Sequence, residues 1–298
     1  MRFLTCLMLA LSATFGAELP TCYRTVNRVT WIVENIDKAR RAWELLGLSG
    51  IREYQNIQLV GDYRGKPVTI YAWQITGELG NLTIDMIQPA EGQSNAYTNF
   101  LSKHDDGILA IVHEAPDRQT LDREIRRMKE KGVSVLQQVT MQGKEGPVTY
   151  VYFDTEPEGK FVLGLVYGSG LQTRSGRALI SHFGSVVWDV KAVSAYWEKL
   201  GFPALSMRAD EAGIDVGWQR HAQFGYEWIS PPASPTSIYA EFLNRHHREG
   251  IHHIALQVED VGKVVESYQK LGFKARRQGN QVYLDADGGV SMELSSKP

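Results

Sequence analysis

Apolar and polar residues follow the same order four times along the chain. An apolar strand leads into an acidic or amide turn, then into an amphipathic segment of period 3.6 that ends in a Leu-Gly or Lys-Gly pair. The final glycine is typical of a helix C-terminal cap. Each copy therefore predicts a strand followed by a helix, and the copies lie at 29–48, 109–133, 183–202 and 254–273.

Two or three further strand-like segments follow each predicted helix. Examples are 81–89, 160–168, 224–232 and 290–296. The repeating unit is therefore βαβββ. A second pair of related segments, 94–112 and 236–256, each carries a short helical pattern between two modules.

These repeats predict an α+β protein with four βαβββ modules in two tandem domains. We expect the first domain at 23–167 and the second at 179–298. The Gly- and Ser-rich stretch 168–178 is the predicted linker between them.

Composition limits the class of protein. The 298 residues are 43% apolar and 22% charged, with 28 Gly and 11 Pro, which is typical of an ordinary globular protein and excludes disordered, collagen-like and coiled-coil chains. The net charge is −2 and no run is rich in Lys or Arg. We therefore expect no nucleic-acid partner and no anionic membrane partner.

The first 17 residues differ from the rest of the chain. Arg2 precedes the uncharged, apolar stretch 3–17, which is too short to span a bilayer and ends in small residues. This pattern predicts a signal peptide at 1–17 and an exported protein, periplasmic or secreted, with no transmembrane segment after cleavage. A buried N-terminal helix is the alternative, and lipid attachment at Cys22 is not expected. Cleavage would remove Cys6 and leave Cys22 alone, so the mature chain would have no internal disulfide.

Several motifs connect the modules to a known family. The motifs HFGSVVWD (182–189), GIHHIALQVED (250–260) and the closing strand MELSS (292–296) stand in paired βαβββ modules. This combination resembles the vicinal oxygen chelate superfamily, which includes glyoxalase I, methylmalonyl-CoA epimerase, extradiol dioxygenases and bleomycin-resistance proteins. The segment 227–260 is most similar to the epimerase and glyoxalase-like branch. The resemblance implies the fold more strongly than the substrate.

The resemblance implies a metal site in the second domain, with ligands on the first and last strand of each module. Those positions hold two histidines and two glutamates: His182, Glu227, His253 and Glu293. Strand alternation supports this set, because each side chain falls opposite the apolar residues that a helix would cover. Mixed nitrogen and oxygen ligands suit one divalent ion, which we leave as Zn, Ni, Co, Mn or Fe. His252 alternates away from the metal and is expected to support a ligand or the fold, and His221, His246 and His247 are expected to face solvent.

The equivalent positions of the first domain differ. They hold Arg28, Asp85, Ala110 and Gly164, of which only Asp85 could bind a cation. We therefore expect the first domain to have lost its metal site.

The resemblance implies a divalent-metal enzyme that chelates a small carbonyl substrate and transfers a proton through an enolate, as an isomerase or lyase of the epimerase or glyoxalase type. Glu227 and Glu293, which come from different modules, are the candidate catalytic bases. Export argues against a coenzyme A thioester as the substrate. Modules could pair within the chain or between the chains of a homodimer.

Two alternatives remain at this stage. An extradiol-type ring-cleaving dioxygenase would use His182, His253 and Glu293 as its 2-His-1-carboxylate triad, with Glu227 as an unexpected fourth donor. A non-catalytic binding protein of the bleomycin-resistance type would use aromatic residues to line a cleft. Candidates for that lining, or else for the core, are Trp188, Trp197, Trp218 and Trp228.

Overall fold

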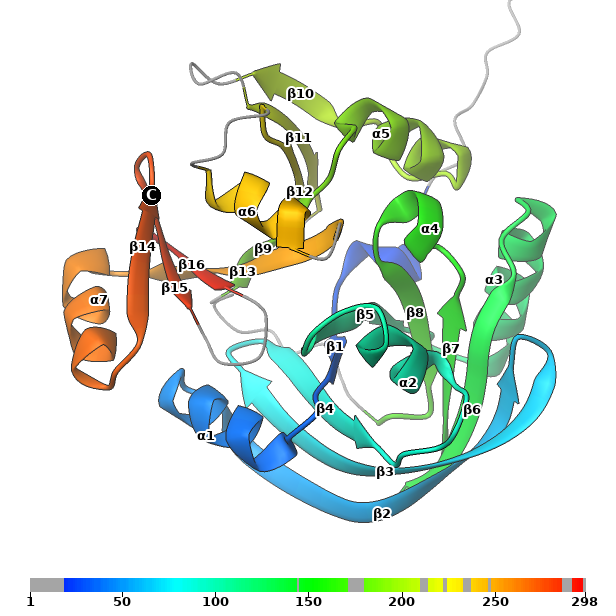
Figure 1. Cartoon of the computed structure of the whole chain (residues 1–298). Coiled ribbons are helices and arrows are strands. Elements are labelled where there is room, and N and C mark those ends of the chain that lie inside the picture. The colour runs from blue at the N-terminus through cyan, green and yellow to red at the C-terminus, as the bar shows by residue number, and fades with distance from the viewer. Residues whose placement is uncertain are drawn as a thin grey trace, which may run out of the picture.

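The computed structural model describes most of the chain after the N-terminal segment (Figure 1). The described residues are 19–143, 145–170, 180–209, 214–221, 224–232, 237–245, 248–285 and 291–296. The predicted signal peptide, most of the predicted linker, and His246 and His247 lie outside them. No helix in the described part of the chain has the length and apolarity to cross a membrane.

The N-terminal half contains two βαβββ modules. The first consists of β1 (Arg28–Ile32), α1 (Ile36–Leu45), β2 (Ser49–Tyr63), β3 (Lys66–Leu79) and β4 (Leu82–Pro89). Helix α2 (Ala96–Leu101) leads into the second, which consists of β5 (Gly107–Glu114), α3 (Arg118–Glu130), β6 (Val135–Gly143), β7 (Gly146–Phe153), the short α4 (Glu156–Gly159) and β8 (Val162–Tyr167). A 3-10 turn, η1 (Thr21–Arg24), precedes β1 and buries Cys22.

The C-terminal half repeats this order. Its first module consists of β9 (Ile180–Val186), α5 (Val190–Lys199), β10 (Ser206–Ala209), β11 (Asp215–Arg220) and β12 (Gly225–Ser230). Helix α6 (Ile238–Asn244) leads into β13 (Gly250–Val258), α7 (Val261–Lys270), β14 (Lys274–Gln278), β15 (Gln281–Asp285) and β16 (Ser291–Ser296). The four predicted βαβββ modules are therefore confirmed.

The acidic or amide turns of the repeats are helix N-caps. In all four copies the side chain of the turn residue accepts a hydrogen bond from a backbone N–H of the first helical turn, which would otherwise be unpaired. The capping residues are Asn35, Asp117, Asp189 and Asp260.

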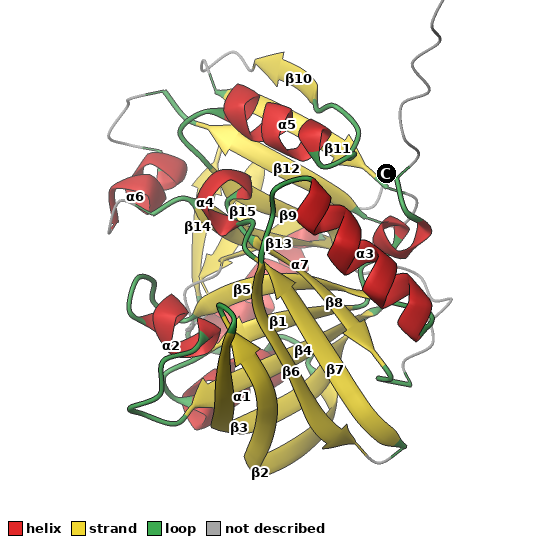
Figure 2. Ribbon diagram, turned by 90° about the vertical axis from the view of Figure 1, so that its right-hand side faces the viewer, coloured by secondary structure: helices red, strands yellow, loops and turns green. Residues whose placement is uncertain are grey.

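The two halves differ in whether their sheet closes. In the N-terminal half, β2 and β6 are 15 and 9 residues long and pair antiparallel from Val60↔Thr140 to Tyr63↔Gln137, which closes an eight-stranded barrel. The corresponding strands of the C-terminal half, β10 and β14, have 4 and 5 residues and are the two edges of an open eight-stranded sheet. Figure 2 shows the barrel below and the open sheet above.

The two halves pack through a shared apolar core. Phe161, which precedes β8, stacks on Trp197 of α5 and Tyr226 of β12, with ring centroids 4.8 and 5.5 Å apart. The indole N–H of Trp197 donates to the carbonyl oxygen of Gly159 at 3.2 Å. Two ion pairs between described residues also join the halves: Lys160 to Glu249 at 2.7 Å and Arg248 to Asp105 at 4.0 Å. The interface resembles a domain core, so we expect the two halves to unfold together.

The substitution Gly159→Ala tests this interface. A Cβ atom at Gly159 would lie 2.7 Å from Trp197 Cζ2 and 2.8 Å from Tyr196 Cε1, both in buried rings. We expect the substitution to lower the free energy of unfolding by about 1–3 kcal/mol, because the rings have no free space to move into. Urea denaturation measures the change. Glu158→Ala, at an exposed position of the same turn, is the control and should change the stability little.

Candidate metal centre

Four adjacent strands carry the four predicted ligands. The strand order β12-β9-β13-β16 places Glu227, His182, His253 and Glu293 on consecutive strands. His253 is the register partner of Gly184, and Ala255 pairs with both His182 and Glu293. The residues between them point the other way: Phe183, Ile254 and Met292 belong to the main hydrophobic core. The alternation of apolar and polar residues therefore directs all four ligands to the concave face.

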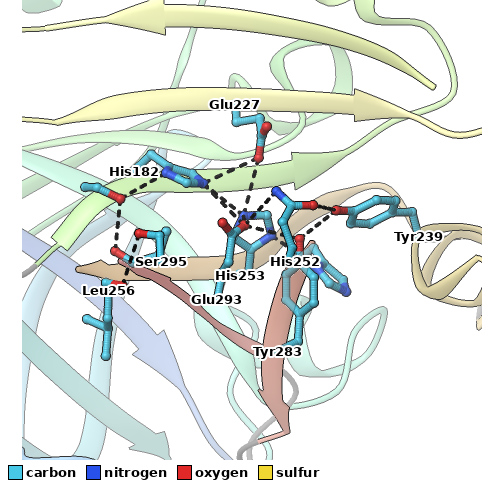
Figure 3. A network of polar contacts seen from close by, with 12 residues as sticks. His182, Glu227, Tyr239, His252, His253, Leu256, Tyr283, Glu293 and Ser295 are labelled. Carbon is cyan, nitrogen blue, oxygen red and sulfur yellow. Dashed lines mark hydrogen bonds and ion pairs between the residues drawn. The ribbon is translucent and has the colours of Figure 1, made fainter. Parts of the chain in front are cut away.

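The ligand atoms converge on one point (Figure 3). His182 Nε2 and His253 Nε2 are 3.2 Å apart, and Glu227 Oε2 lies 3.4 and 3.5 Å from them. Glu293 Oε2 is 3.1 Å from His253 Nε2 and 3.7 Å from His182 Nε2. Metal–ligand bonds of about 2.0–2.2 Å would separate neighbouring ligand atoms by about 3.0–3.5 Å. The donor set and its spacing fit one divalent ion.

The site is buried, and its charges compensate one another. Each of the four residues is at most 6% exposed. Burial alone would lower the pKa of His253, but Glu227 and Glu293 outweigh it and raise that pKa to about 9. The pKa of His182 is raised for the same reasons. Burial would raise the pKa values of the two carboxyls, but the imidazoles lower both. Glu227 Oε2 is buried and accepts no hydrogen bond among the described residues, as expected of a carboxylate aimed at a cation.

Contacts outside the tetrad orient the two imidazoles. His182 Nδ1 lies 3.1 Å from Ser181 Oγ, which also donates to the carbonyl oxygen of Ala255. His253 Nδ1 lies 3.1 Å from His252 Nδ1. Burial and the neighbouring His253 lower the pKa of His252 well below its usual value, so His252 is neutral and can accept from His253 Nδ1–H. Both contacts leave Nε2 free to bind a metal.

His252 contacts the ligand His253 through Nδ1, which agrees with the supporting role predicted for it, but it does not face away from the site as strand alternation predicts. A β-bulge between Ile251 and His253 shifts the β13–β9 register, so His252 and His253 lie beside each other with ring centroids 5.4 Å apart. The alternation of residues along one strand cannot reveal such a bulge, because the bulge depends on how β13 pairs with β9.

A chain of tyrosines holds Glu293. Tyr283 Oη donates to Glu293 Oε2 at 3.1 Å, and Gln281 Nε2 donates to the same oxygen at 3.4 Å. Tyr239 Oη, from α6, lies 2.6 Å from Tyr283 Oη. The sequence analysis missed these residues, although the related segments around α2 and α6 both carry a tyrosine, Tyr97 and Tyr239, at the same position.

Gly184 makes room for His253. A Cβ atom at Gly184 would collide with the imidazole ring of His253, so the ring can reach the tetrad only because this position has no side chain. Trp218 of β11 packs against His182 on the other side of the tetrad. The centroids of the two rings are 4.8 Å apart in an edge-to-face arrangement. The other three tryptophans that were candidates for the cleft lining do not line the site. Trp197 and Trp228 are buried in the core, and Trp188 is exposed.

His221 is half-buried rather than facing solvent as predicted. Its ring stacks on Phe224 with centroids 4.9 Å apart, and burial lowers its pKa to about 4. It contacts core residues and not the tetrad.

The N-terminal half holds a salt bridge at the corresponding place. Thr30 is the register partner of Asp85 and Ala110, as Gly184 is of Glu227 and His253, which confirms the predicted equivalence of the two sets of positions. Arg28 donates to Asp85 and, at 2.7 Å, to Tyr150 Oη. Thr76 Oγ1 also donates to Asp85, at 2.7 Å. A guanidinium thus supplies the positive charge that a metal ion would supply in the other half.

Comparison with known families agrees with the fold. Residues 27–153 and 181–289 match the family described as Glyoxalase/Bleomycin resistance protein/Dioxygenase superfamily. The chain belongs to this superfamily. No curated protein matches the sequence significantly.

Solved structures of low sequence identity share the fold. A mutant of 4-hydroxymandelate synthase from Streptomyces coelicolor is similar with a TM-score of 0.60 and 14% identity, over 91% of this chain and 92% of that one. A halotolerant catechol dioxygenase is similar with a TM-score of 0.50 and 13% identity, over 92% of this chain and 87% of that one. A hypothetical protein from Staphylococcus aureus is similar with a TM-score of 0.56 and 8% identity, over 91% of this chain and 99% of that one. At these identities the similarities show the fold alone, and the narrower resemblance to the methylmalonyl-CoA epimerase branch stays a prediction.

The substitution Gly184→Ala should impair metal binding although it changes none of the four ligand residues. The added methyl group would displace the His253 ring, and we expect the affinity for a divalent metal to fall by about 10- to 100-fold, as when an orienting contact is lost. Calorimetric titration of chelator-treated protein with Zn²⁺ or Mn²⁺ measures this. Gly225→Ala is the matched control, because its Cβ would meet Trp218 and His182 only at 3.4 and 3.5 Å, which are ordinary contact distances. Equal affinities for both variants would contradict the role of Gly184.

The buried salt bridge of the N-terminal half can be tested by its stability. Arg28→Met leaves the Asp85 carboxylate buried without its cation, so we expect a loss of about 3–5 kcal/mol in the free energy of unfolding. The double variant Arg28→Met/Asp85→Leu removes both charges and should recover most of that loss. Urea denaturation measures both. A loss below about 1 kcal/mol for the single variant, as for an exposed pair, would show that Asp85 does not depend on Arg28.

Proposed function

We propose that the protein is a divalent-metal-dependent enzyme that transfers a proton at a carbon next to the carbonyl group of a small substrate. The main support is Glu227, the fourth buried candidate metal ligand. Its Oε2 faces both imidazoles and accepts no hydrogen bond among the described residues. The chain can thus offer two carboxylates at one metal, one on each side of the histidine pair.

The two carboxylates suit different tasks. A divalent ion held by the tetrad would polarise a carbonyl oxygen and so acidify the adjacent C–H bond. Glu227, whose Oε2 faces the two imidazoles, is assigned to remove that proton after its carboxylate leaves the ion to make room for the substrate. Glu293, which Tyr283 and Gln281 hold in place, approaches from β16 on the opposite side. It would take up a proton from solvent and deliver it to the carbon while Glu227 releases its own proton to solvent, so the transfers balance and solvent hydrogen enters the product.

A ring-cleaving dioxygenase is the second candidate. The structural similarity to a catechol dioxygenase and the His182–His253–Glu293 subset of the tetrad favour it. Glu227 argues against it, because a fourth protein ligand would fill a coordination position that dioxygen or a chelated catechol needs.

Metal analysis combined with isotope exchange tests the proposal. We expect about one divalent metal per chain by elemental mass spectrometry, and deuterium uptake from D₂O next to the carbonyl in a panel of 2-hydroxy ketones, 2-oxo acids and 2-branched thioesters. Glu227→Gln should lower the exchange rate by about 10²–10⁴-fold, because it removes the base but keeps an oxygen ligand. His221→Gln, outside the tetrad, is the control and should retain the wild-type exchange rate.

Two results would contradict this function. Oxygen consumption by the Fe²⁺-loaded protein with catechols, undiminished in Glu227→Gln, would favour the dioxygenase. A wild-type protein that binds no divalent metal would favour a non-catalytic binding protein.

A further inference from the structure

A cavity among the described residues lies between the two halves, beside the tetrad. Its volume is about 830 Å³. Helix α1 of the N-terminal half forms one wall, and α6, β14 and the turn after α7 form the others. Figure 1 shows α1 close to α7 and β14 on this side of the molecule. The cavity is therefore built by both domains, although only the second carries the candidate metal site.

Positive charge dominates the walls of this cavity. Five cations line it, against the two carboxylates of Glu241 and Asp285; the cations are Lys38, Arg41, Arg245, Lys274 and Arg276. Both carboxylates already have partners. Arg276 donates to Glu241 at 2.6 Å, and Ser291 Oγ donates to Asp285 at 3.1 Å.

Three of the cations have no partner of opposite charge within the described parts of the chain. They are Arg41 on α1, Arg245 after α6 and Lys274 on β14. Three unpaired cations around one concave surface favour the binding of an anion, because each adds a charge-assisted hydrogen bond that nothing else in the protein uses.

The same cavity has an apolar wall. Leu45 of α1 and Leu271 after α7 are 45% and 51% exposed, and both line it. Phe242 and Phe273 contribute ring surface between them. Leucines this exposed in a concave surface would be covered by an apolar ligand, with a gain of roughly 25 cal/mol per Å² of apolar surface buried.

The cavity adjoins the tetrad on the same face of the sheet. Ser291, which lines the cavity, is the register partner of His253. Arg276 is the register partner of Tyr283, which in turn pairs with Glu293. His252, whose Nδ1 contacts His253, also lines the cavity. A molecule that fills this space can therefore extend towards the metal ligands.

We propose that this cavity binds an organic carboxylate with an apolar body. Helix α1 of the N-terminal half, which does not contribute to the tetrad, supplies part of the recognition through Arg41 and Leu45. Resting on the proposed function, this assigns the substrate class as an amphiphilic carboxylic acid whose reacting carbonyl lies near the tetrad. It also gives the N-terminal half a role in specificity.

Octanoate is a suitable probe, and calorimetric titration of the full chain measures its binding directly. We expect the double variant Arg41→Gln/Lys274→Gln to bind octanoate at least about tenfold more weakly, because two charge-assisted contacts are lost. Arg277→Gln is the matched control, since Arg277 lies next to Arg276 on β14, is exposed and does not line the cavity. Leu271→Ser should weaken octanoate binding but not acetate binding.

Neutral and small probes separate the two parts of the proposal. Octanol should bind at least about tenfold more weakly than octanoate, since it lacks the charge. Inorganic phosphate should bind more weakly than octanoate, since it lacks the apolar body. Equal binding of octanol, or phosphate binding as tight as that of octanoate, would overturn the assignment, as would an equal loss in Arg277→Gln.

The metal dependence distinguishes this proposal from the proposed function. Octanoate binding should persist after treatment with a chelator, because the cavity cations and not the tetrad hold the carboxylate. Loss of binding on chelation would overturn the cavity site, since octanoate would then be a metal ligand. A protein that binds octanoate but catalyses no deuterium exchange would contradict only the proposed function.

Discussion

The antiparallel pairing of β9 with β13 is the interaction on which the candidate site depends. It joins the two modules of the C-terminal half at the centre of their sheet and places His182 and His253 side by side. Each imidazole then needs a carboxylate on the strand outside it, and β12 and β16 supply Glu227 and Glu293. Four ionisable groups can be buried together because two cations or one metal ion balance two anions.

Strand length decides what each half can do. Both halves have the same module order, but the long β2 and β6 meet and close a barrel, whereas β10 and β14 end too early to do so. The barrel interior is filled by α2, apolar side chains and the Arg28–Asp85 pair. In the open half, the same face of the sheet holds the tetrad and the neighbouring cavity. One fold thus provides a rigid support in one half and an accessible site in the other.

The interface between the halves links these two roles. The stacking of Phe161 on Trp197 and Tyr226 fixes the barrel against the open sheet. Helix α1 of the N-terminal half and β14 of the C-terminal half then line one cavity. In the proposal above, the N-terminal half contributes to ligand binding through α1, without donating to the tetrad.

The sequence by itself determined the modular plan and the four ligand positions. Local signals suffice for the modular plan, since N-cap residues such as Asp189 and Asp260 mark helix starts. The ligand positions came from the family resemblance, and alternation along β13 and β16 supported them by separating His253 and Glu293 from their apolar neighbours. Only the tertiary structure decided the rest. The bulge at His252, the space that Gly184 leaves for an imidazole, the hold of Tyr283 on Glu293 and the closure of one sheet but not the other arise from contacts between residues far apart in the chain. Such contacts depend on register and strand pairing, which local periodicity does not specify.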